Sequence, residues 1–128
     1  MSGFRGYIAS RPLFGGDRAP QHVQNIVLRD YARRKGLTYL LSAVEYTMPA
    51  CYQMLATVLE ELPKLDGIIA YSLFMLPEND DDRRAIYDAV LASNAEMHFV
   101  VEDLAITRAD DVDRIEDIWL VQKFVSRK

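Results

Sequence analysis

Residues 65–79 read LDGIIAYSLFMLPEN. Within them the segment 66–72, DGIIAYS, is nearly continuous in apolar residues, which is typical of a strand covered on both faces of a parallel sheet. A short hydrophobic turn and a proline follow, so the chain leaves this strand through an apolar loop. A strand of this kind needs helices on both faces of its sheet, and the flanking sequence supplies them.

Short apolar segments alternate with amphipathic segments along the whole chain. Strands are predicted at residues 4–10, 37–42, 66–72 and 97–104, and helices at residues 20–35, 50–62, 80–93 and 110–124. Pro20 marks the start of the first helix and Gly36 its end, as helix termini favour. The alternation predicts a single three-layer α/β domain over residues 1–128, with a four-stranded, mainly parallel sheet and flanking helices.

The composition is that of an ordinary soluble domain, because half of the 128 residues are hydrophobic and 27% are charged. A net charge of −4 argues against a nucleic-acid partner, since such surfaces usually carry a basic excess. No apolar run is long enough to span a membrane, and the N-terminus has no signal-peptide pattern. The single cysteine, Cys51, cannot form an internal disulfide and favours a cytoplasmic location.

Polar side chains follow every predicted strand. The carboxyl ends of parallel strands meet at one edge of a sheet, where ligands of such folds bind, so we expect these side chains around a common hollow. They are Ser10, Arg11, Glu45, Tyr46, Tyr71, Ser72 and Glu102, joined by Arg18 from the glycine-containing loop and by Gln24 and Asn25 from the first helix.

Glu45, Ser10 and Glu102 are the candidate catalytic residues. A carboxyl group whose pKa is raised by burial can act as a general acid or base, and Glu45 is the first choice; the alternatives are an exposed glutamate or a helix cap. Ser10 has no base near it in the sequence, so a nucleophilic role needs a partner supplied by the fold. Arg11 and Arg18 can hold a phosphate or carboxylate, or else pair with local acids.

Metal and cofactor signatures are missing from the sequence. Two isolated histidines and one cysteine give no metal-ligand spacing, and the dinucleotide fingerprint G-x-G-x-x-G is absent. We therefore expect neither a metal nor a cofactor.

Two segments resemble the catalytic domain of the serine recombinases (resolvases and invertases). The family's first strand, roughly Y-x-R-V-S, is matched by residues 7–11, YIASR, and its later segment D-G-hydrophobic run-Y-x-L-D-R-L-x-R by residues 66–78. The helical segment LRDYARRKGL, residues 28–37, is also similar. The resemblance covers roughly residues 5–104 and implies a resolvase-like, flavodoxin-like fold.

The residues of recombinase chemistry are not matched. Ala9 stands at the place of the arginine in the first strand, and Arg11 at the place of the nucleophilic serine. Phe74 and Met75 replace an aspartate and an arginine in the later segment, and Glu78 replaces the last arginine. Exchange of phosphodiesters needs several cations around the phosphate, so this resemblance implies the fold without recombinase activity.

Over nearly its whole length the chain resembles the "sporadic carbohydrate cluster" proteins, a family named for its setting among genes of sugar or natural-product biosynthesis. The matching blocks are G-Y-x-x-S-R-P, the glycine loop, V-Q-N-x-V-L-R-D-Y, L-L-S-A-x-E-Y-x-M-P and Y-S-L-F-M-L-P. This resemblance adds Met75 to the candidate ligand-binding residues, in a hydrophobic segment expected to line a pocket.

Together these patterns predict a small enzyme of carbohydrate or sugar-derived natural-product biosynthesis. With a carboxylate and no cofactor, the expected reactions on a polar or phosphorylated sugar-like substrate are those of an isomerase, an epimerase or a dehydratase (a lyase). One alternative is a non-catalytic partner of a sugar-modifying enzyme, with residues 73–76 as an exposed contact surface; another is a degenerate DNA-binding module. We also expect a homo-oligomer, while the substrate and the existence of turnover stay open.

Overall fold

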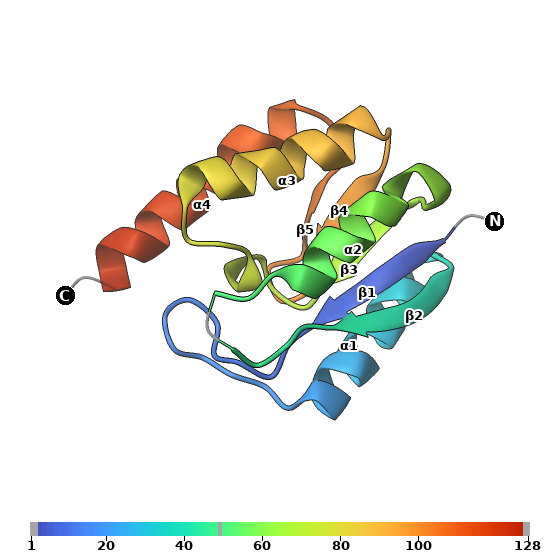
Figure 1. The fold of residues 1–128 in the computed structure, drawn as a ribbon, viewed down its shortest axis with the longest axis horizontal. Helices are drawn as coiled ribbons and strands as arrows, with labels where there is room; N and C mark the ends of the chain where they lie inside the picture. Colours follow the sequence, from blue (N-terminus) through green and yellow to red (C-terminus); the bar gives the residue numbers. More distant parts are fainter. Residues whose placement is uncertain (1–2, 49, 127–128) are drawn as a thin grey trace.

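A computed structural model describes residues 3–48 and 50–126 of the chain. The elements, in chain order, are β1 (Phe4–Ile8), α1 (Gln21–Lys35), β2 (Tyr39–Val44), α2 (Gln53–Glu61), the 3-10 turn η1 (Leu62–Lys64), β3 (Gly67–Ala70), the 3-10 turn η2 (Leu73–Met75), α3 (Asp80–Ala92), β4 (Glu96–Phe99), β5 (Leu104–Ile106) and α4 (Asp110–Ser126) (Figure 1).

The sheet has the strand order β2-β1-β3-β4-β5. The first four strands in this order are parallel, and β5 runs antiparallel to β4 at the edge. The predicted α/β class with a mainly parallel sheet and flanking helices is confirmed. The strand count of four was wrong by one, because the segment predicted as a single strand at residues 97–104 reverses direction after Phe99. Asp103, whose φ of 52° is left-handed, precedes β5 in this turn.

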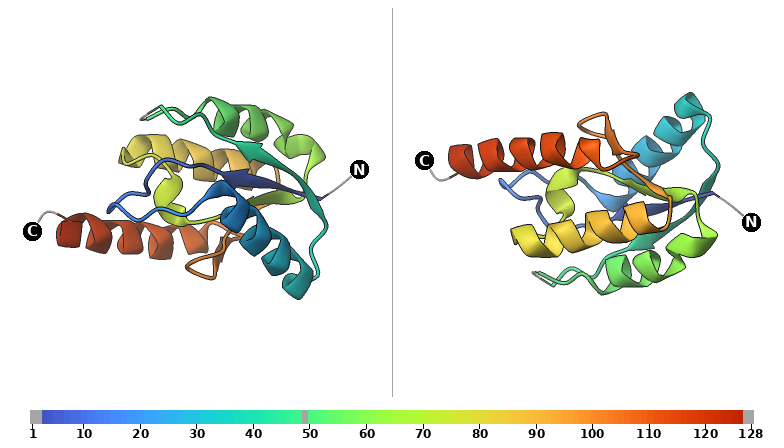
Figure 2. Two further views of the ribbon diagram at one scale, coloured as in Figure 1. Left: turned by 90° about the horizontal axis from the view of Figure 1, so that it is seen from below. Right: turned by 90° about the horizontal axis from the view of Figure 1, so that it is seen from above.

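Helices cover both faces of the sheet, as Figure 2 shows for α1 on one side and for α2 and α3 on the other. Alternate residues of β3 point to opposite faces: Ile68 belongs to the core under α2 and α3, and Ile69 to the core under α1. Both isoleucines are fully buried. The two cores make the central strand apolar at every position, which explains the continuous apolar run in the sequence.

The helix ends follow local capping chemistry. Gly36 terminates α1 in the left-handed conformation with φ 70°, and its amide donates to the carbonyls of Ala32 and Arg33. Asn79 caps α3 by accepting a hydrogen bond from the amide of Asp82 at 3.0 Å. The helices therefore begin and end close to the predicted residues, with α2 starting at Gln53, three residues later than expected.

Within the described ranges, no helix has both the length and the apolar character that crossing a membrane requires.

Candidate functional site

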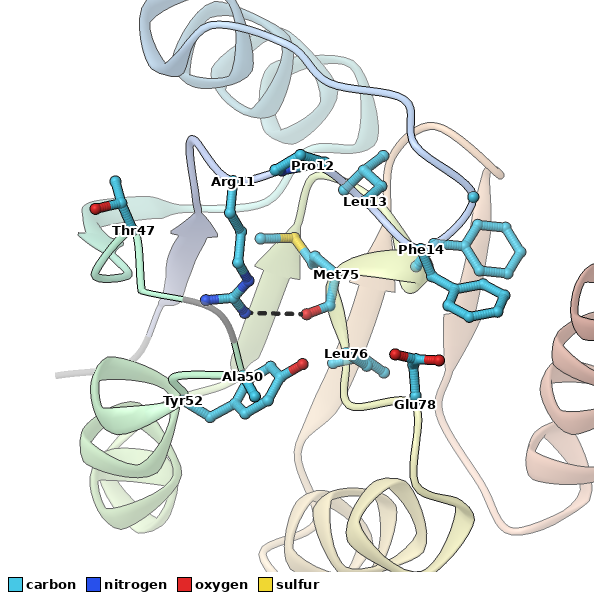
Figure 3. A pocket seen from close by; sticks show the side chains of 12 residues that line it. Arg11, Pro12, Leu13, Phe14, Thr47, Ala50, Tyr52, Met75, Leu76 and Glu78 are labelled. Atoms are coloured by element: carbon cyan, nitrogen blue, oxygen red, sulfur yellow. Dashed lines mark hydrogen bonds between the residues drawn. The ribbon is translucent and has the colours of Figure 1, made fainter. Parts of the chain in front are cut away.

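A cavity of about 400 Å³ opens at the carboxyl edge of the sheet (Figure 3). Three loops form it, following β1, β2 and β3. The lining residues are Arg11, Pro12, Leu13, Phe14, Gly15, Thr47, Ala50, Tyr52, Phe74, Met75, Leu76 and Glu78. Its volume is in the usual range for small-molecule sites, and it lies at the edge where parallel α/β sheets bind their ligands.

Arg11 is the cation of this cavity. Its Nη1 donates to the carbonyl of Cys51 at 2.7 Å and to that of Tyr46 at 3.4 Å, and its guanidinium lies 4.6 Å from the ring centre of Tyr52. A longer contact of 3.5 Å joins Nη2 to the carbonyl of Met75. Among the described residues, Arg11 forms no ion pair with a carboxylate. Neutral carbonyls therefore orient its positive charge without cancelling it.

Tyr52 contributes a hydroxyl group to the cavity. Burial raises the pKa of Tyr52; the positive charge of Arg11 opposes this shift and the negative charge of Glu78 adds to it. The hydroxyl consequently stays protonated at neutral pH and can donate a hydrogen bond. Figure 3 shows it pointing into the cavity, toward the side on which Glu78 lies.

Aromatic side chains build the wall opposite Arg11. Phe14 and Phe74 both line the cavity, and the amide of Phe14 donates to the carbonyl of Phe74 at 2.9 Å. Both rings pack against Trp119 of α4, with ring centres 5.2 Å and 5.1 Å from it. Trp119 is fully buried behind them, so α4 supports the apolar wall without lining the cavity.

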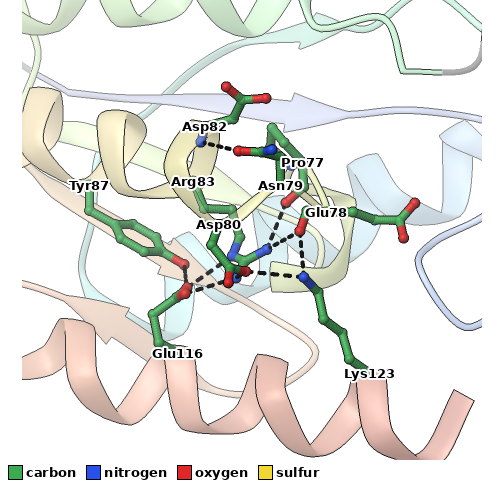
Figure 4. A network of polar contacts seen from close by, with 9 residues as sticks. All are labelled: Pro77, Glu78, Asn79, Asp80, Asp82, Arg83, Tyr87, Glu116 and Lys123. Carbon is green, nitrogen blue, oxygen red and sulfur yellow. Dashed lines mark hydrogen bonds and ion pairs between the residues drawn. The ribbon is translucent and has the colours of Figure 1, made fainter. Parts of the chain in front are cut away.

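The segment that carries Glu78 is held by a network of polar contacts between α3 and α4 (Figure 4). Arg83, only 1% exposed, donates to the carboxylate of Glu116 at 2.8 and 2.9 Å and to the carbonyl of Glu78 at 2.7 Å. Lys123 of α4 also donates to the Glu78 carbonyl, at 2.7 Å. The backbone at Glu78 is thus fixed from two helices, while its side chain is left to the cavity and solvent.

Glu45 has a different place from the one predicted. It is 2% exposed, lies outside the cavity lining, and accepts hydrogen bonds from the amides of Met54 at 3.0 Å and Leu55 at 3.1 Å, in the first turn of α2. Its own neighbour Tyr46 and the hydroxyl of Tyr7 donate to it as well, at 3.1 and 2.8 Å. Glu45 therefore caps the N-terminus of α2, which was one of the alternatives to a catalytic role.

The expectation of a raised pKa for Glu45 was wrong. Burial, the largest single influence, raises the pKa of this carboxyl, but the four hydrogen bonds it accepts together outweigh burial and lower it. Glu45 is consequently ionised at neutral pH and has its oxygens occupied. That is the state of a structural anion.

Glu102 and Ser72 are joined to each other, away from the cavity lining. The Ser72 hydroxyl donates to the Glu102 carboxylate at 2.7 Å, and the amide of Leu73 donates to the same carboxylate at 2.9 Å. Ser72 also accepts from the amide of Phe74 at 3.1 Å and so caps η2. The pair shapes the turn that brings Phe74 and Met75 to the cavity wall.

Gln24 and Asn25 hold neighbouring segments together. The buried Gln24 side chain bonds both backbone groups of Ala9, donating to its carbonyl at 2.6 Å and accepting from its amide at 3.1 Å. Asn25 accepts from the hydroxyl of Ser42 at 2.5 Å. Neither residue lines the cavity.

The predicted common hollow around Arg11, Glu45 and Tyr71 was wrong, since Arg11 alone of the three lines the cavity. Tyr71 packs against both core clusters, and Tyr46, half exposed, offers Arg11 only its carbonyl. Ser10 and Arg18 line a separate, shallower depression together with Ala19 and Pro20. Arg11 and Met75 are thus the predicted site residues that the structure brings together.

Sequence reasoning missed Tyr52, Glu78, Phe14 and Thr47 as cavity residues. Tyr52 fell inside a segment predicted as helix, although α2 begins one residue after it. Glu78 follows the hydrophobic turn after β3, and the same strand-end rule extended by a few residues would have found it.

The non-catalytic alternative supposed that the hydrophobic turn at residues 73–76 is an exposed contact surface. The structure contradicts this expectation. Leu73, Met75 and Leu76 are 0%, 4% and 2% exposed, and Phe74 is half-buried against Trp119. The turn contributes to the core and to the cavity wall instead.

Comparison with known proteins identifies the fold. No family model matches the chain, and no curated protein matches it. Two solved structures share its architecture. A resolvase family site-specific recombinase from Streptococcus pneumoniae superposes with a TM-score of 0.66 at 8% identity, over 97% of this chain and 91% of that one. The N-terminal catalytic domain of TP901-1 integrase gives 0.67 at 13% identity, over 96% and 97%.

The chain has the resolvase fold. At these identities the likeness extends to the fold alone. The resolvase-like architecture expected from the sequence is therefore confirmed.

Proposed function

We propose that this protein binds a polar, anionic, sugar-like small molecule in the cavity around Arg11. We further propose that it belongs to the sporadic carbohydrate cluster family and works in the cytoplasm, in the biosynthesis of carbohydrates or sugar-derived natural products. The observation that carries the proposal is the half-buried guanidinium of Arg11, oriented by carbonyls and paired with no carboxylate among the described residues.

An arginine in this state favours an anion. Its planar fork matches the oxygens of a phosphate or carboxylate, and a half-buried charge attracts an anion more strongly than one in open water. The aromatic wall of Phe14 and the ring of Tyr52 offer apolar surface to the carbon face of a sugar ring. A phosphorylated monosaccharide combines both features.

Glu78 and Tyr52 would carry out acid–base chemistry in this cavity, because the carboxylate of Glu45 already accepts hydrogen bonds as a helix cap. Glu78 is an exposed carboxylate at the cavity wall, and the protonated hydroxyl of Tyr52 points toward the same side of the cavity. One base and one donor are sufficient for isomerisation, epimerisation or dehydration of a sugar-like substrate. Binding without turnover is the alternative function of the same cavity.

Calorimetry with hexose 6-phosphates and the parent hexoses tests the binding proposal. We expect the phosphates to bind and the parent sugars to bind much more weakly. Arg11→Gln should lower the affinity about ten- to hundredfold, the loss typical of a charge-assisted hydrogen bond. The exposed Arg114 on α4 provides the matched control, Arg114→Gln. Equal affinity for both sugar classes, or an unaffected Arg11→Gln variant, would refute the proposal.

Turnover is tested separately from binding. Incubation of the protein with aldose and ketose phosphates in D2O reports proton abstraction as loss of the carbon-bound proton signal in NMR spectra. We expect this exchange in the native protein and at least a hundredfold slower exchange in Glu78→Gln. Tight binding with no exchange in either protein would favour the non-catalytic alternative.

A further inference from the structure

The cavity has opposite charges at its two ends. Figure 3 shows Arg11 on one side and the carboxylate of Glu78 on the other, with Tyr52, Met75 and Leu76 between them. Among the described residues no ion pair joins Arg11 to Glu78. A ligand that reaches across the cavity therefore meets a cation and then an anion.

The two basic side chains that bind the backbone of Glu78 do not bind its carboxylate. Arg83 and Lys123 both donate to the backbone carbonyl of Glu78 and to the carboxylate of Asp80. Figure 4 shows the Glu78 side chain pointing away from this network. In the part of the chain that the structure describes, no hydrogen bond or ion pair involves the Glu78 carboxylate, which is thus available to a cation of the ligand.

We propose that the ligand carries an ammonium group as well as an anionic group, as in an amino sugar phosphate. This inference rests on the proposed function, because it assigns the anionic group to Arg11 and adds a second determinant at the far end. The ammonium would lie at Glu78, on the side of the cavity toward which the Tyr52 hydroxyl points. A hexose phosphate without an amino group would pair with Arg11 and leave Glu78 without a partner.

Three phosphates built on the same glucose ring separate the contributions: glucose 6-phosphate, glucosamine 6-phosphate and N-acetylglucosamine 6-phosphate. At about pH 6.5 the free amine is protonated, while acetylation removes its charge. We expect glucosamine 6-phosphate to bind about fivefold more tightly than the other two, which is the upper range for a partly exposed ion pair. The preference should vanish in Glu78→Gln and persist in Glu60→Gln, an exposed control on α2.

The outcomes distinguish this inference from the proposed function. Equal or weaker binding of the amino sugar by the native protein, with the phosphates still requiring Arg11, would overturn the inference and leave the proposed function standing. A preference that survives Glu78→Gln would also overturn it. Failure of all three phosphates to bind would overturn the proposed function itself.

Discussion

Arg11 and Glu45 show how neighbouring contacts decide the role of a charged residue. Both follow a strand at the same edge of the sheet, and both are bound by the region that runs from the end of β2 into the first turn of α2. Arg11 donates to carbonyls there, which leave its positive charge uncompensated. Glu45 meets amides, which compensate its charge inside the protein. The loop carbonyls therefore leave the charge of Arg11 uncompensated, while the amides at the start of α2 make Glu45 a structural ion.

Replacement of Glu45 by glutamine should destabilise the protein. The amide cannot accept all four hydrogen bonds as well as the carboxylate does, and its NH2 group would face amide donors. We expect a loss of about 2 kcal/mol in the free energy of unfolding, measured with urea at pH 7. Glu60→Gln, at an exposed position, is the control and should be neutral.

The difference in stability between the native protein and Glu45→Gln should also depend on pH. The folded-state pKa of Glu45 is lowered below its ordinary value of 4.5, so its contribution is complete above that value and is lost as the pH falls through the folded-state pKa. The stability gap between native protein and Glu45→Gln should accordingly shrink as the pH is lowered below about 4.5. A gap that stays constant down to pH 3 would contradict the helix-cap assignment.

At the scale of elements, a network of charged side chains around the buried Arg83 joins α3 to α4. Glu116 of α4 accepts from the guanidinium of Arg83 and, at 2.6 Å, from the hydroxyl of Tyr87. Arg83 also lies 4.2 Å from the ring centre of Trp119. The network connects α4 to the segment before α3, and through Trp119 to the aromatic wall of the cavity.

Glu116→Gln should therefore affect both stability and the cavity. Removing the carboxylate leaves the buried Arg83 with two carbonyls and the exposed carboxylate of Asp80, and we expect a loss of about 3 kcal/mol in the free energy of unfolding. Asp117→Asn, at the next and exposed position of α4, should change little. Urea unfolding followed by the fluorescence of Trp119 measures both variants; equal stabilities would show that the network contributes nothing.

At the scale of the whole molecule, the fold is that of the resolvase-family structures, and the cavity is built by loops at one edge of the sheet. The strands and the helices superpose on recombinase catalytic domains over almost the entire chain. The loops at the carboxyl edge of the sheet enclose one arginine, one glutamate and an aromatic wall. A shared fold does not determine the activity, which depends on the residues of the site.

The expectation of a homo-oligomer stays a prediction. The terminal half of α4 exposes Leu120, Val121 and Val125 by 68%, 63% and 55%, and a second copy of this helix would bury such a face on both chains. We expect a mass above the 14.6 kDa chain in analytical ultracentrifugation, and the monomer mass for Leu120→Asp. Val101→Asp, at an exposed valine near β4, is the control. A native protein that stays monomeric at high concentration would contradict this prediction.

The sequence by itself determined the order of the elements and the class of the fold. Apolar periodicity, together with local signals such as Pro20 and Gly36, acts between residues a few positions apart, so it can be read along the chain. The reversal of direction before β5 lay in an apolar, strand-like segment, and that local pattern does not distinguish one strand from two.

Only the tertiary structure decided which polar residues face the cavity. Glu45, Gln24 and Glu102 are all bound by backbone groups from segments 9 to 29 positions away in the sequence, and no local pattern records those partners. Tyr52 and Glu78 became site residues because distant loops leave their side chains facing one space. A polar group becomes structural or available according to the donors and acceptors that folding brings to it, and that is a property of long-range packing.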